Sequence, residues 1–180
     1  MLRIFLKAMK VKLGKHIKFK GIPVIVNKRG ASMTIGDNCV IKSSLLSNLV
    51  GLYQRTIIVT RTPEAKIVIG NNVGISGATI YARSEITIGD RTCIGGNTKI
   101  LDNDFHPLEI EARNADVKEK IGTKPIHIGQ DCFIGCNALI LKGTTLGDGC
   151  VVGAGAVVSG SFEAGSVIAG NPARVIRRIS

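Results

Sequence analysis

The side chains best suited to moving a proton lie together in the segment Asp102-Asn103-Asp104-Phe105-His106-Pro107. Histidine has an ordinary pKa close to neutral pH, so His106 could take a proton from a substrate or return one. Such an imidazole needs an acceptor that holds its second nitrogen, and Asp104 and Asp102 are the nearest carboxylates. Asp104 could orient the ring, fix the loop or bind a hydroxyl group. Taken alone, a His-Pro pair in a loop favours the plainer role of capping a turn.

A six-residue repeat indicates the scaffold that must position this segment. From Ile128 to Glu163 the chain reads IGQDCF, IGCNAL, ILKGTT, LGDGCV, VGAGAV and VSGSFE, and an aliphatic residue opens every phrase. This period fits neither a helix, which repeats about every 3.6 residues, nor a long alternating strand. It fits coils that turn a corner every six residues, with short strands between the corners. The chain is therefore predicted to be all-β, a parallel β-helix whose stacked coils bury one continuous core.

Two interruptions of the repeat predict loops outside that core. The same phrase occurs earlier, at Ile35, Ile69 and Ile88, but the rhythm is lost over residues 42–56. It breaks again after Asp102, and the excursion over residues 107–124 is rich in Glu, Lys, Arg and Asn. Loops on a rigid scaffold commonly carry function. These two stretches are therefore expected to select the substrate.

Positive charge is concentrated at the N-terminus. The chain has 24 Lys and Arg against 13 Asp and Glu, and its net charge is +11. Residues 1–30 contain nine of the basic residues and no acidic one. Apolar residues at roughly helical spacing predict a short amphipathic helix or arm: Leu2, Phe5, Leu6, Met9 and Leu13. This arm either caps the open end of the solenoid or binds anionic lipid or an acidic carrier substrate. Nucleic acid is disfavoured because no aromatic residues interleave with the basic ones.

Cysteine usage and the absence of a targeting segment predict a cytoplasmic protein. The five Cys form no paired CxxC motifs, and Cys39, Cys132 and Cys150 take the small fifth place of a phrase, which indicates packed thiols. No run reaches the roughly 18 apolar residues of a membrane-spanning helix, and the N-terminus lacks the apolar centre of a signal peptide. The expected organisation is a basic arm over residues 1–13, peripheral to the inner membrane if it binds lipid, and one β-helix domain over residues 14–180.

An ordered set of motifs resembles one known family. The motifs are NNVGISGATI at 71–80, DNDFHPLE at 102–109, KPIHIGQDCFIG at 124–135, and VVGAGAVV at 151–158 followed by AGNPARVIR at 169–177. With them the chain resembles, over about residues 14–179, the hexapeptide-repeat acyltransferases, and within these the acetyl-CoA-dependent sugar O-acetyltransferases of capsule, O-antigen and exopolysaccharide synthesis. The resemblance implies a left-handed parallel β-helix, a homotrimer with active sites between neighbouring subunits, acetyl-CoA as acyl donor, and no metal.

The resemblance also implies a direct transfer without a covalent acyl-enzyme. In this family a histidine deprotonates the acceptor hydroxyl that attacks the thioester, and His106 occupies the position of that histidine. A sugar hydroxyl is a poor nucleophile near neutral pH, and a general base typically contributes about 10²–10⁴-fold. The remainder must come from positioning and from donors aimed at the developing oxyanion. Gly135 lies at the turn that matches those donors, and Asp104 is the candidate for orienting His106.

Further positions match residues that line the coenzyme tunnel of the family. Cys136 stands where a sugar-acetylating relative has Ser near the acetyl group, although a plain surface thiol is an equal reading. Ala154 matches a backbone position that binds the pantetheine amides. Ser159 matches a Thr of the same run, whereas Gly160 replaces the Lys that commonly follows, which removes one expected phosphate contact.

Two arginines near the C-terminus complete the expected coenzyme contacts. Arg174 and Arg177 match basic residues near the adenosine phosphates, where a guanidinium suits multiply charged phosphate. Solvated charges on a tail are their plainer reading. Phe133 replaces a frequent Trp, which keeps an aromatic wall with a different shape.

Three other functions remain as alternatives. An N-acetyltransferase of a nucleotide-linked amino sugar needs the same base, so the catalytic residues do not discriminate between the two acceptors. A γ-class carbonic anhydrase holds zinc with three histidines on the same fold, and this chain has three, at 16, 106 and 127. Their spacing does not match, because two ligands of that family lie close together on one strand. A scaffold without catalytic activity would leave His106 and the coenzyme motifs without a purpose.

Overall fold

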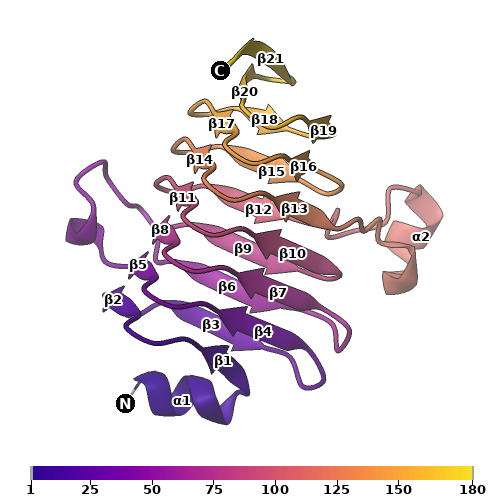
Figure 1. Cartoon of the computed structure of the whole chain (residues 1–180). Coiled ribbons are helices and arrows are strands. Elements are labelled where there is room, and N and C mark those ends of the chain that lie inside the picture. The colour runs from indigo at the N-terminus through magenta and orange to yellow at the C-terminus, as the bar shows by residue number, and fades with distance from the viewer. Residues whose placement is uncertain (1, 180) are drawn as a thin grey trace.

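The chain folds as a parallel β-helix in the computed structural model, which describes residues 2–179 (Figure 1). Three short strands make one coil, and within the solenoid the strands pair in parallel with the equivalent strands of neighbouring coils. The six-residue repeat therefore predicted the architecture correctly. Between Leu2 and Ile179 no helix is long and apolar enough to cross a membrane.

Three sheets form the walls of the solenoid. Sheet A consists of β1 (Val11–Leu13), β4 (Ser32–Ile35), β7 (Lys66–Ile69), β10 (Glu85–Ile88), β13 (Ile126–Ile128), β16 (Thr145–Leu146) and β19 (Ser161–Phe162). Sheet B consists of β2 (Lys18–Lys20), β5 (Val40–Lys42), β8 (Gly74–Ser76), β11 (Cys93–Ile94), β14 (Phe133–Ile134), β17 (Val151–Val152), β20 (Ser166–Gly170) and β21 (Ala173–Arg178). Sheet C consists of β3 (Val24–Asn27), β6 (Ile57–Thr60), β9 (Thr79–Ala82), β12 (Lys99–Leu101), β15 (Leu139–Leu141) and β18 (Val157–Val158).

The core is a set of aliphatic columns that run along the solenoid axis. In sheet A, for example, Ile67, Ile86 and Ile126 lie in register on successive coils and are all fully buried. The residues that open the six phrases are likewise buried: Ile128, Ile134, Ile140, Leu146, Val152 and Val158. Burying one such side chain contributes about 1.5–3 kcal/mol, so the repeat supplies most of the driving force for stacking.

The buried cysteines confirm the prediction of packed thiols. Cys39, Cys132 and Cys150 are at most 1% exposed and occupy equivalent corners. Each thiol lies near a backbone carbonyl of the next coil, as between Cys132 Sγ and Gly147 O at 3.3 Å. Burial raises the pKa of the Cys132 thiol to about 11, so this group stays protonated and unreactive at neutral pH.

The two interruptions of the repeat project from different corners of the solenoid (Figure 1). We name each line of corners by the sheets that it joins. The segment over residues 43–56 leaves the B–C corner and contains the short helix η1 (Leu45–Ser47). The polar excursion leaves the C–A corner between β12 and β13 and contains α2 (Ile110–Asn114) and η2 (Lys118–Lys120). Both segments lie outside the core, as the sequence predicted.

The chain ends differ from the sequence-based expectation. Helix α1 (Leu2–Ala8) covers the N-terminal end of the solenoid, where Leu6 is fully buried. The expected arm over residues 1–13 is shorter, because Val11 already pairs with Met33 in sheet A and is buried in the first coil. The expected C-terminal tail is strand β21, which pairs antiparallel with β20.

Candidate active site

His106 is presented on a tight turn at the start of the polar excursion. Its backbone N–H donates to Asp104 O at 2.7 Å, and the Phe105 N–H donates to Asn103 Oδ1 at 2.9 Å. Phe105 has a φ of 63°, a left-handed conformation that this bond to Asn103 supports. The turn leaves the His106 side chain exposed, so its imidazole is free to meet a substrate.

A buried carboxylate anchors the turn to the coil below it. Asp102 is 0% exposed, and its carboxylate accepts the N–H groups of Arg83 at 2.8 Å and Ser84 at 2.7 Å. The side-chain amide of Asn103 donates to the same carboxylate at 3.1 Å. Burial raises the pKa of Asp102, although these hydrogen bonds oppose the rise. Of the two carboxylates considered from the sequence, Asp102 fixes the loop.

Asp104 faces the following coil. Its carboxylate forms an ion pair with Lys142, and the two side chains are only 20% and 28% exposed. Its backbone N–H donates to Gly122 O at 3.0 Å, which ties the end of the excursion to its beginning. Within residues 2–179 no hydrogen bond joins the Asp104 side chain to His106. Asp104 therefore acts here by bracing the excursion, and its orienting role stays a proposal.

A cavity of about 200 Å³ adjoins His106 under the excursion. The rings of Tyr81 and Phe105 form an aromatic wall, with centroids 4.9 Å apart. The other walls are mostly polar and come from Arg61, Arg83, Asn103, Asp116, Lys118 and Ile121. An imidazole, an aromatic wall and hydrogen-bonding groups together can accommodate a sugar-sized ligand.

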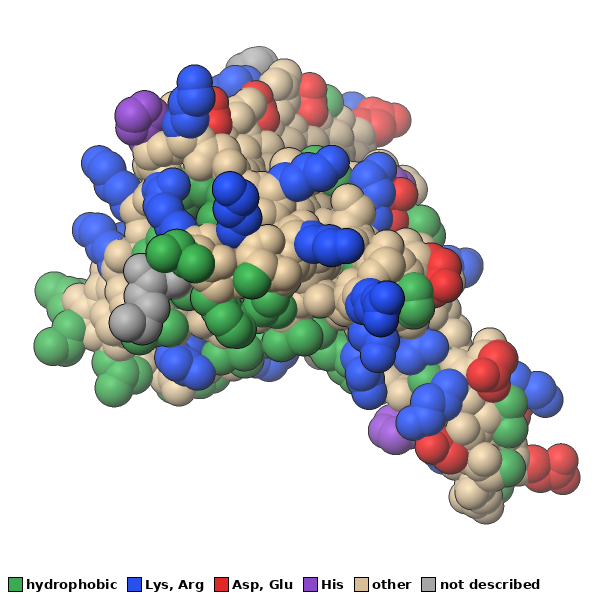
Figure 2. Space-filling view, turned by 90° about the horizontal axis from the view of Figure 1, so that it is seen from below, with side chains coloured by type: hydrophobic (Ala, Val, Ile, Leu, Met, Phe, Trp, Pro, Cys, Tyr) green, Lys and Arg blue, Asp and Glu red, His purple; other side chains and the backbone are tan. Residues whose placement is uncertain are grey.

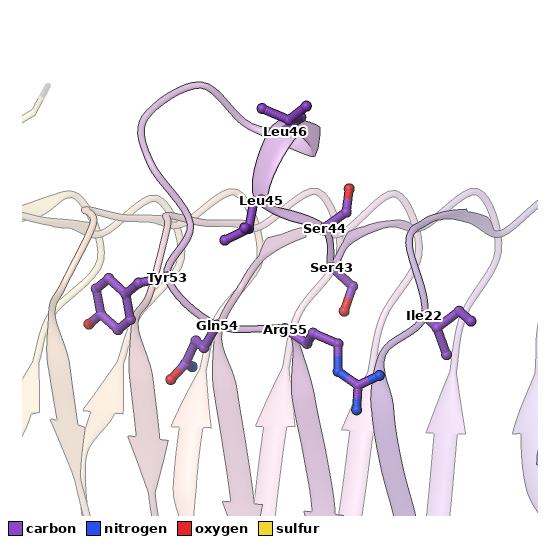
Figure 3. A pocket seen from close by; sticks show the side chains of 8 residues that line it. All are labelled: Ile22, Ser43, Ser44, Leu45, Leu46, Tyr53, Gln54 and Arg55. Atoms are coloured by element: carbon purple, nitrogen blue, oxygen red, sulfur yellow. The ribbon is translucent and has the colours of Figure 1, made fainter.

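A larger cavity lies on a different corner. It measures about 630 Å³ and is formed where the segment over residues 43–56 overhangs sheet C (Figure 3). Leu45 and Leu46 stand above it, and Tyr53, Gln54 and Arg55 line its floor. Its lining contains no histidine and little that could transfer a proton. The chemistry therefore points to the smaller cavity at His106.

Gly135, Cys136 and Ala154 lie on the B–C corner. They are the residues expected near the thioester and the pantetheine arm of the coenzyme. The Gly135 N–H donates to Val152 O at 2.7 Å, so it is already used within the fold. A Cβ at Gly135 would lie 2.5 Å from Ala154 N, and glycine is therefore required for the coils to approach. Among the described residues, the N–H groups of Cys136 and Ala154 have no protein acceptor.

This B–C corner differs from the A–B corner on several coils. There, a side chain of the next coil accepts the N–H that follows the corner glycine in four cases, whereas the N–H groups of Asp90 and Asp148 have no protein acceptor among the described residues. Asn71 N–H donates to Asp90 Oδ1 at 2.7 Å, and Gln130 N–H donates to Asp148 Oδ1 at 3.0 Å. No such acid or amide caps Cys136 and Ala154 within residues 2–179. Their N–H groups can therefore serve a ligand that carries carbonyl or oxyanion oxygens.

The remaining expected residues lie elsewhere. Ser159 is exposed on the C–A corner, two coils beyond His106. Arg174 and Arg177 are exposed on β21 at the C-terminal end of sheet B. Strand β15 lies between Cys136, which precedes it, and Lys142, which follows it. Lys142 is the ion-pair partner of Asp104, so Asp104 and Cys136 lie at opposite ends of this strand. One chain therefore does not gather the expected catalytic and coenzyme residues at a single place.

Two arginines at the His106 cavity were missed in the sequence. Arg61 and Arg83 each follow a strand of sheet C, and the register pairs Thr60 with Ala82 just before them. The two arginines therefore stack on adjacent coils. Aligning the coils by register would have revealed this pair, but the two arginines are 22 residues apart, which is not a multiple of the six-residue repeat.

The three histidines occupy separate parts of the solenoid. His16 lies on the A–B corner of the first coil, and His127 lies on β13, where its Nδ1 is 2.9 Å from Thr87 Oγ1. Across residues 2–179, no three His, Cys, Asp or Glu side chains converge as a metal site would require.

Comparisons with known proteins agree with the repeat. Residues 125–159 match the family model described as the hexapeptide repeat of succinyl-transferase. The galactoside O-acetyltransferase of Escherichia coli K12 is 36% identical over 118 residues, which cover 62% of this chain and 56% of that protein. A solved hexapeptide-repeat acetyltransferase of Vibrio cholerae O1 biovar eltor, complexed with acetyl coenzyme A, is 30% identical over 68% of each chain, with a TM-score of 0.50.

Other matches show how far these likenesses extend. The N-acyltransferase AntD of Bacillus cereus superposes over 99% of this chain and 89% of its own with a TM-score of 0.72, but at 19% identity it shows the fold alone. The chain spans about half or less of the length of the curated relatives that it matches first, and these include transferases to hydroxyl and to amino groups. The repeat, the stacked coils and these matches agree, and the chain belongs to the hexapeptide-repeat acetyltransferase family, whose left-handed parallel β-helix it shares.

Proposed function

We propose that this protein transfers the acetyl group of acetyl-CoA to a hydroxyl group of a sugar, in capsule, O-antigen or exopolysaccharide synthesis. The observation that carries this proposal is the exposed imidazole of His106, held on an anchored turn beside a polar cavity. The galactoside O-acetyltransferase among the relatives supports a sugar acceptor, and the complex of the Vibrio relative supports acetyl-CoA as the donor. The five unpaired thiols are compatible with the cytoplasm, where we place the reaction.

The proposed reaction is a direct transfer. His106 takes the proton of the acceptor hydroxyl while the hydroxyl oxygen attacks the thioester carbonyl carbon. The carbonyl oxygen then carries a negative charge, which N–H donors stabilise. When the carbon–sulfur bond breaks, the imidazolium returns the proton to the departing thiolate. The products are an acetyl ester and free CoA.

We place each active site between two copies of the chain in a homotrimer. One copy supplies the C–A corner with His106, and its neighbour supplies the B–C corner with Cys136 and Ala154. This arrangement is supported by the separation of the two corners within one chain and by the uncapped N–H groups of the B–C corner. These N–H groups would bind the oxyanion and the pantetheine amides. Ser159 and the guanidinium groups of Arg174 and Arg177 would meet the outer parts of the coenzyme.

Complementation between two inactive variants tests the shared site. His106→Ala removes the base, and Ala154→Trp fills the exposed B–C corner without touching the core. Co-expressed in equal amounts, the two variants are expected to recover about one quarter of the native activity. In a cyclic oligomer each interface joins the C–A corner of one copy to the B–C corner of its neighbour. With random mixing, about one interface in four combines a native His106 with a native Ala154. Activity that stays at the level of the separate variants would mean that both corners must come from the same copy.

The class of acceptor is tested with acetyl-CoA and a panel of free, nucleotide-linked and lipid-linked sugars. Release of the CoA thiol identifies an acceptor, and mild alkali then distinguishes an ester from an amide in the product. An alkali-labile acetyl group is expected. A stable amide would favour N-transfer to an amino sugar, which the same base could perform and which relatives named N-acetyltransferases keep as the second candidate. Failure of every acceptor together with failure to bind acetyl-CoA would contradict the proposal.

We also propose that the N-terminal end of the solenoid makes peripheral contact with an anionic membrane. On α1 the side chains of Ile4 and Phe5 are 75% and 59% exposed. Lysine and arginine side chains surround apolar patches on this end of the molecule (Figure 2). An exposed apolar strip beside basic residues, with no acidic residue in residues 1–30, suits a lipid headgroup layer.

Sedimentation with vesicles measures this contact. Lys7→Glu combined with Lys10→Glu is expected to weaken binding to phosphatidylglycerol-containing vesicles by about tenfold or more, because each basic residue contributes about 1 kcal/mol near such a surface. Salt should weaken native binding in the same way. The matched control is Leu108→Ser, an exposed apolar residue on the excursion. Equal binding to neutral phosphatidylcholine vesicles would exclude the electrostatic contact.

A further inference from the structure

Two arginines beside His106 carry charges that the fold does not neutralise. The guanidinium of Arg61 has no hydrogen-bond or ion-pair partner within residues 2–179. That of Arg83 makes one hydrogen bond, from Nη2 to the backbone carbonyl of Lys118 at 3.3 Å. Both side chains line the same cavity as His106.

The nearby acidic groups are engaged elsewhere. Asp102 turns its carboxylate inward to backbone N–H groups, including that of Arg83 itself. Asp104 pairs with Lys142, and Asp116 pairs with Lys118 at 3.1 Å. Neither Arg61 nor Arg83 therefore has a carboxylate partner, and the cavity presents two unneutralised guanidinium groups to a ligand.

Hydrogen bonds of its backbone and its side chain hold Arg83 in place. Asp102 holds the Arg83 N–H on the coil below His106, and the side chain bonds to η2 on the excursion. Arg61 follows the equivalent strand one coil lower. The two arginines thus lie one above the other, on the same corner as the proposed base. Guanidinium groups in such a row match the oxygen spacing of phosphate and carboxylate groups.

We propose that the acceptor is an anionic sugar, whose phosphate or carboxylate group binds Arg61 and Arg83 while its ring lies on the wall of Tyr81 and Phe105. This inference rests on the proposed transferase function and names the chemical class of its acceptor. The anion cannot belong to the coenzyme in the same pose. The thioester must lie at His106 for transfer to occur, and the pantetheine arm separates the thioester from the coenzyme phosphates. The negative charge beside His106 therefore belongs to the acceptor.

Matched sugars test the charge requirement independently of turnover. The protein has three histidines, so the imidazole resonance of His106 can be assigned by comparison with His106→Asn and followed by NMR. The ligands are galactose, galactose 1-phosphate, galacturonate and inorganic phosphate. The charged sugars are expected to bind at least about tenfold more tightly than galactose, because hydrogen bonds between charged groups contribute enough for that factor. The comparison of phosphate with carboxylate shows which anion fits.

Variants assign the effect to the two arginines. Arg61→Gln and Arg83→Gln should each weaken binding of the charged sugars about tenfold and leave galactose nearly unchanged. In the transfer assay they should raise KM for a charged acceptor more than they lower kcat. Arg29→Gln is the matched control, because Arg29 is an exposed arginine of the same corner that lies outside this cavity.

Three outcomes would overturn the inference. They are equal affinity for galactose and its charged forms, an equal effect of Arg29→Gln, and the absence of any shift of the His106 resonance with all four ligands. Acetyl-CoA binding and acetylation of neutral sugars would then still support the transferase function. Conversely, binding of charged sugars that depends on Arg61, without any binding of acetyl-CoA, would retain the anion site and reject the transferase.

Discussion

Replacing His106 with alanine is expected to lower acceptor-dependent release of CoA by about 10²–10⁴-fold, the usual contribution of a general base. The side chain is exposed and its removal leaves no cavity in the core, so stability should change little. Affinity for acetyl-CoA should stay within a few-fold of native, because the proposed coenzyme contacts are made by residues other than His106. Thiol release measures the first effect, and calorimetric titration with CoA measures the second.

His127→Ala is the matched control for this prediction. His127 is also exposed, but it lies on β13 in sheet A, and its contact is to Thr87 at 2.9 Å. Its loss should leave the rate near the native value. A His106→Ala variant that keeps more than about a tenth of the native rate would reject His106 as the base. The same conclusion would follow if both substitutions lowered the rate equally.

Replacing Asp102 with alanine is expected to cost about 3 kcal/mol or more of the free energy of unfolding. The substitution strands the N–H groups of Arg83 and Ser84, and each unsatisfied buried donor costs about 1–3 kcal/mol. It also frees Asn103, which supports the turn that presents His106. The transfer rate should therefore fall as well, although Asp102 touches no substrate. Urea unfolding followed by circular dichroism measures the stability change.

Asp90 provides a control that makes the same kind of contact near solvent. Its carboxylate accepts the Asn71 N–H at 2.7 Å on the A–B corner. In Asp90→Ala, water can replace the carboxylate, so the loss should be clearly smaller than that of Asp102→Ala. Losses of equal size would show that burial of Asp102 is not what makes its hydrogen bonds costly to remove.

The cost of Asp102→Ala should also depend on pH. Burial raises the pKa of Asp102 in the folded protein above its ordinary value, so the folded state binds the proton more tightly than the unfolded state. The stabilisation from this proton is fully present below the ordinary pKa and is lost as pH rises through the raised pKa. The difference in unfolding free energy between native and variant should therefore shrink with rising pH across that interval. A difference that grows with pH would reverse the assigned sign.

Much of the fold could be predicted because its repeat is local. An aliphatic residue every six positions, as at Ile128, Ile134 and Ile140, determines coil, corner and buried face within a few residues. The small fifth place likewise revealed the packed thiols. His106 could be singled out because it stands where the repeat breaks and a polar loop begins. The ends were less predictable: Val11 joins the first coil because of its pairing with Met33, which no local pattern reveals.

The sequence by itself thus determined the stacked-coil architecture and the residue types available for chemistry, whereas the tertiary structure alone decided which groups are free to act. The Gly135 N–H donates to Val152 O, whereas the Cys136 N–H has no protein acceptor among the described residues. Whether such an N–H finds an acceptor depends on the residues of the next coil. The pairing of Asp104 with Lys142 and the stacking of Arg61 under Arg83 have the same origin. Coil lengths vary where segments loop out, so positions that stack on one corner have no constant separation in the chain, and only the register of the strands brings them together.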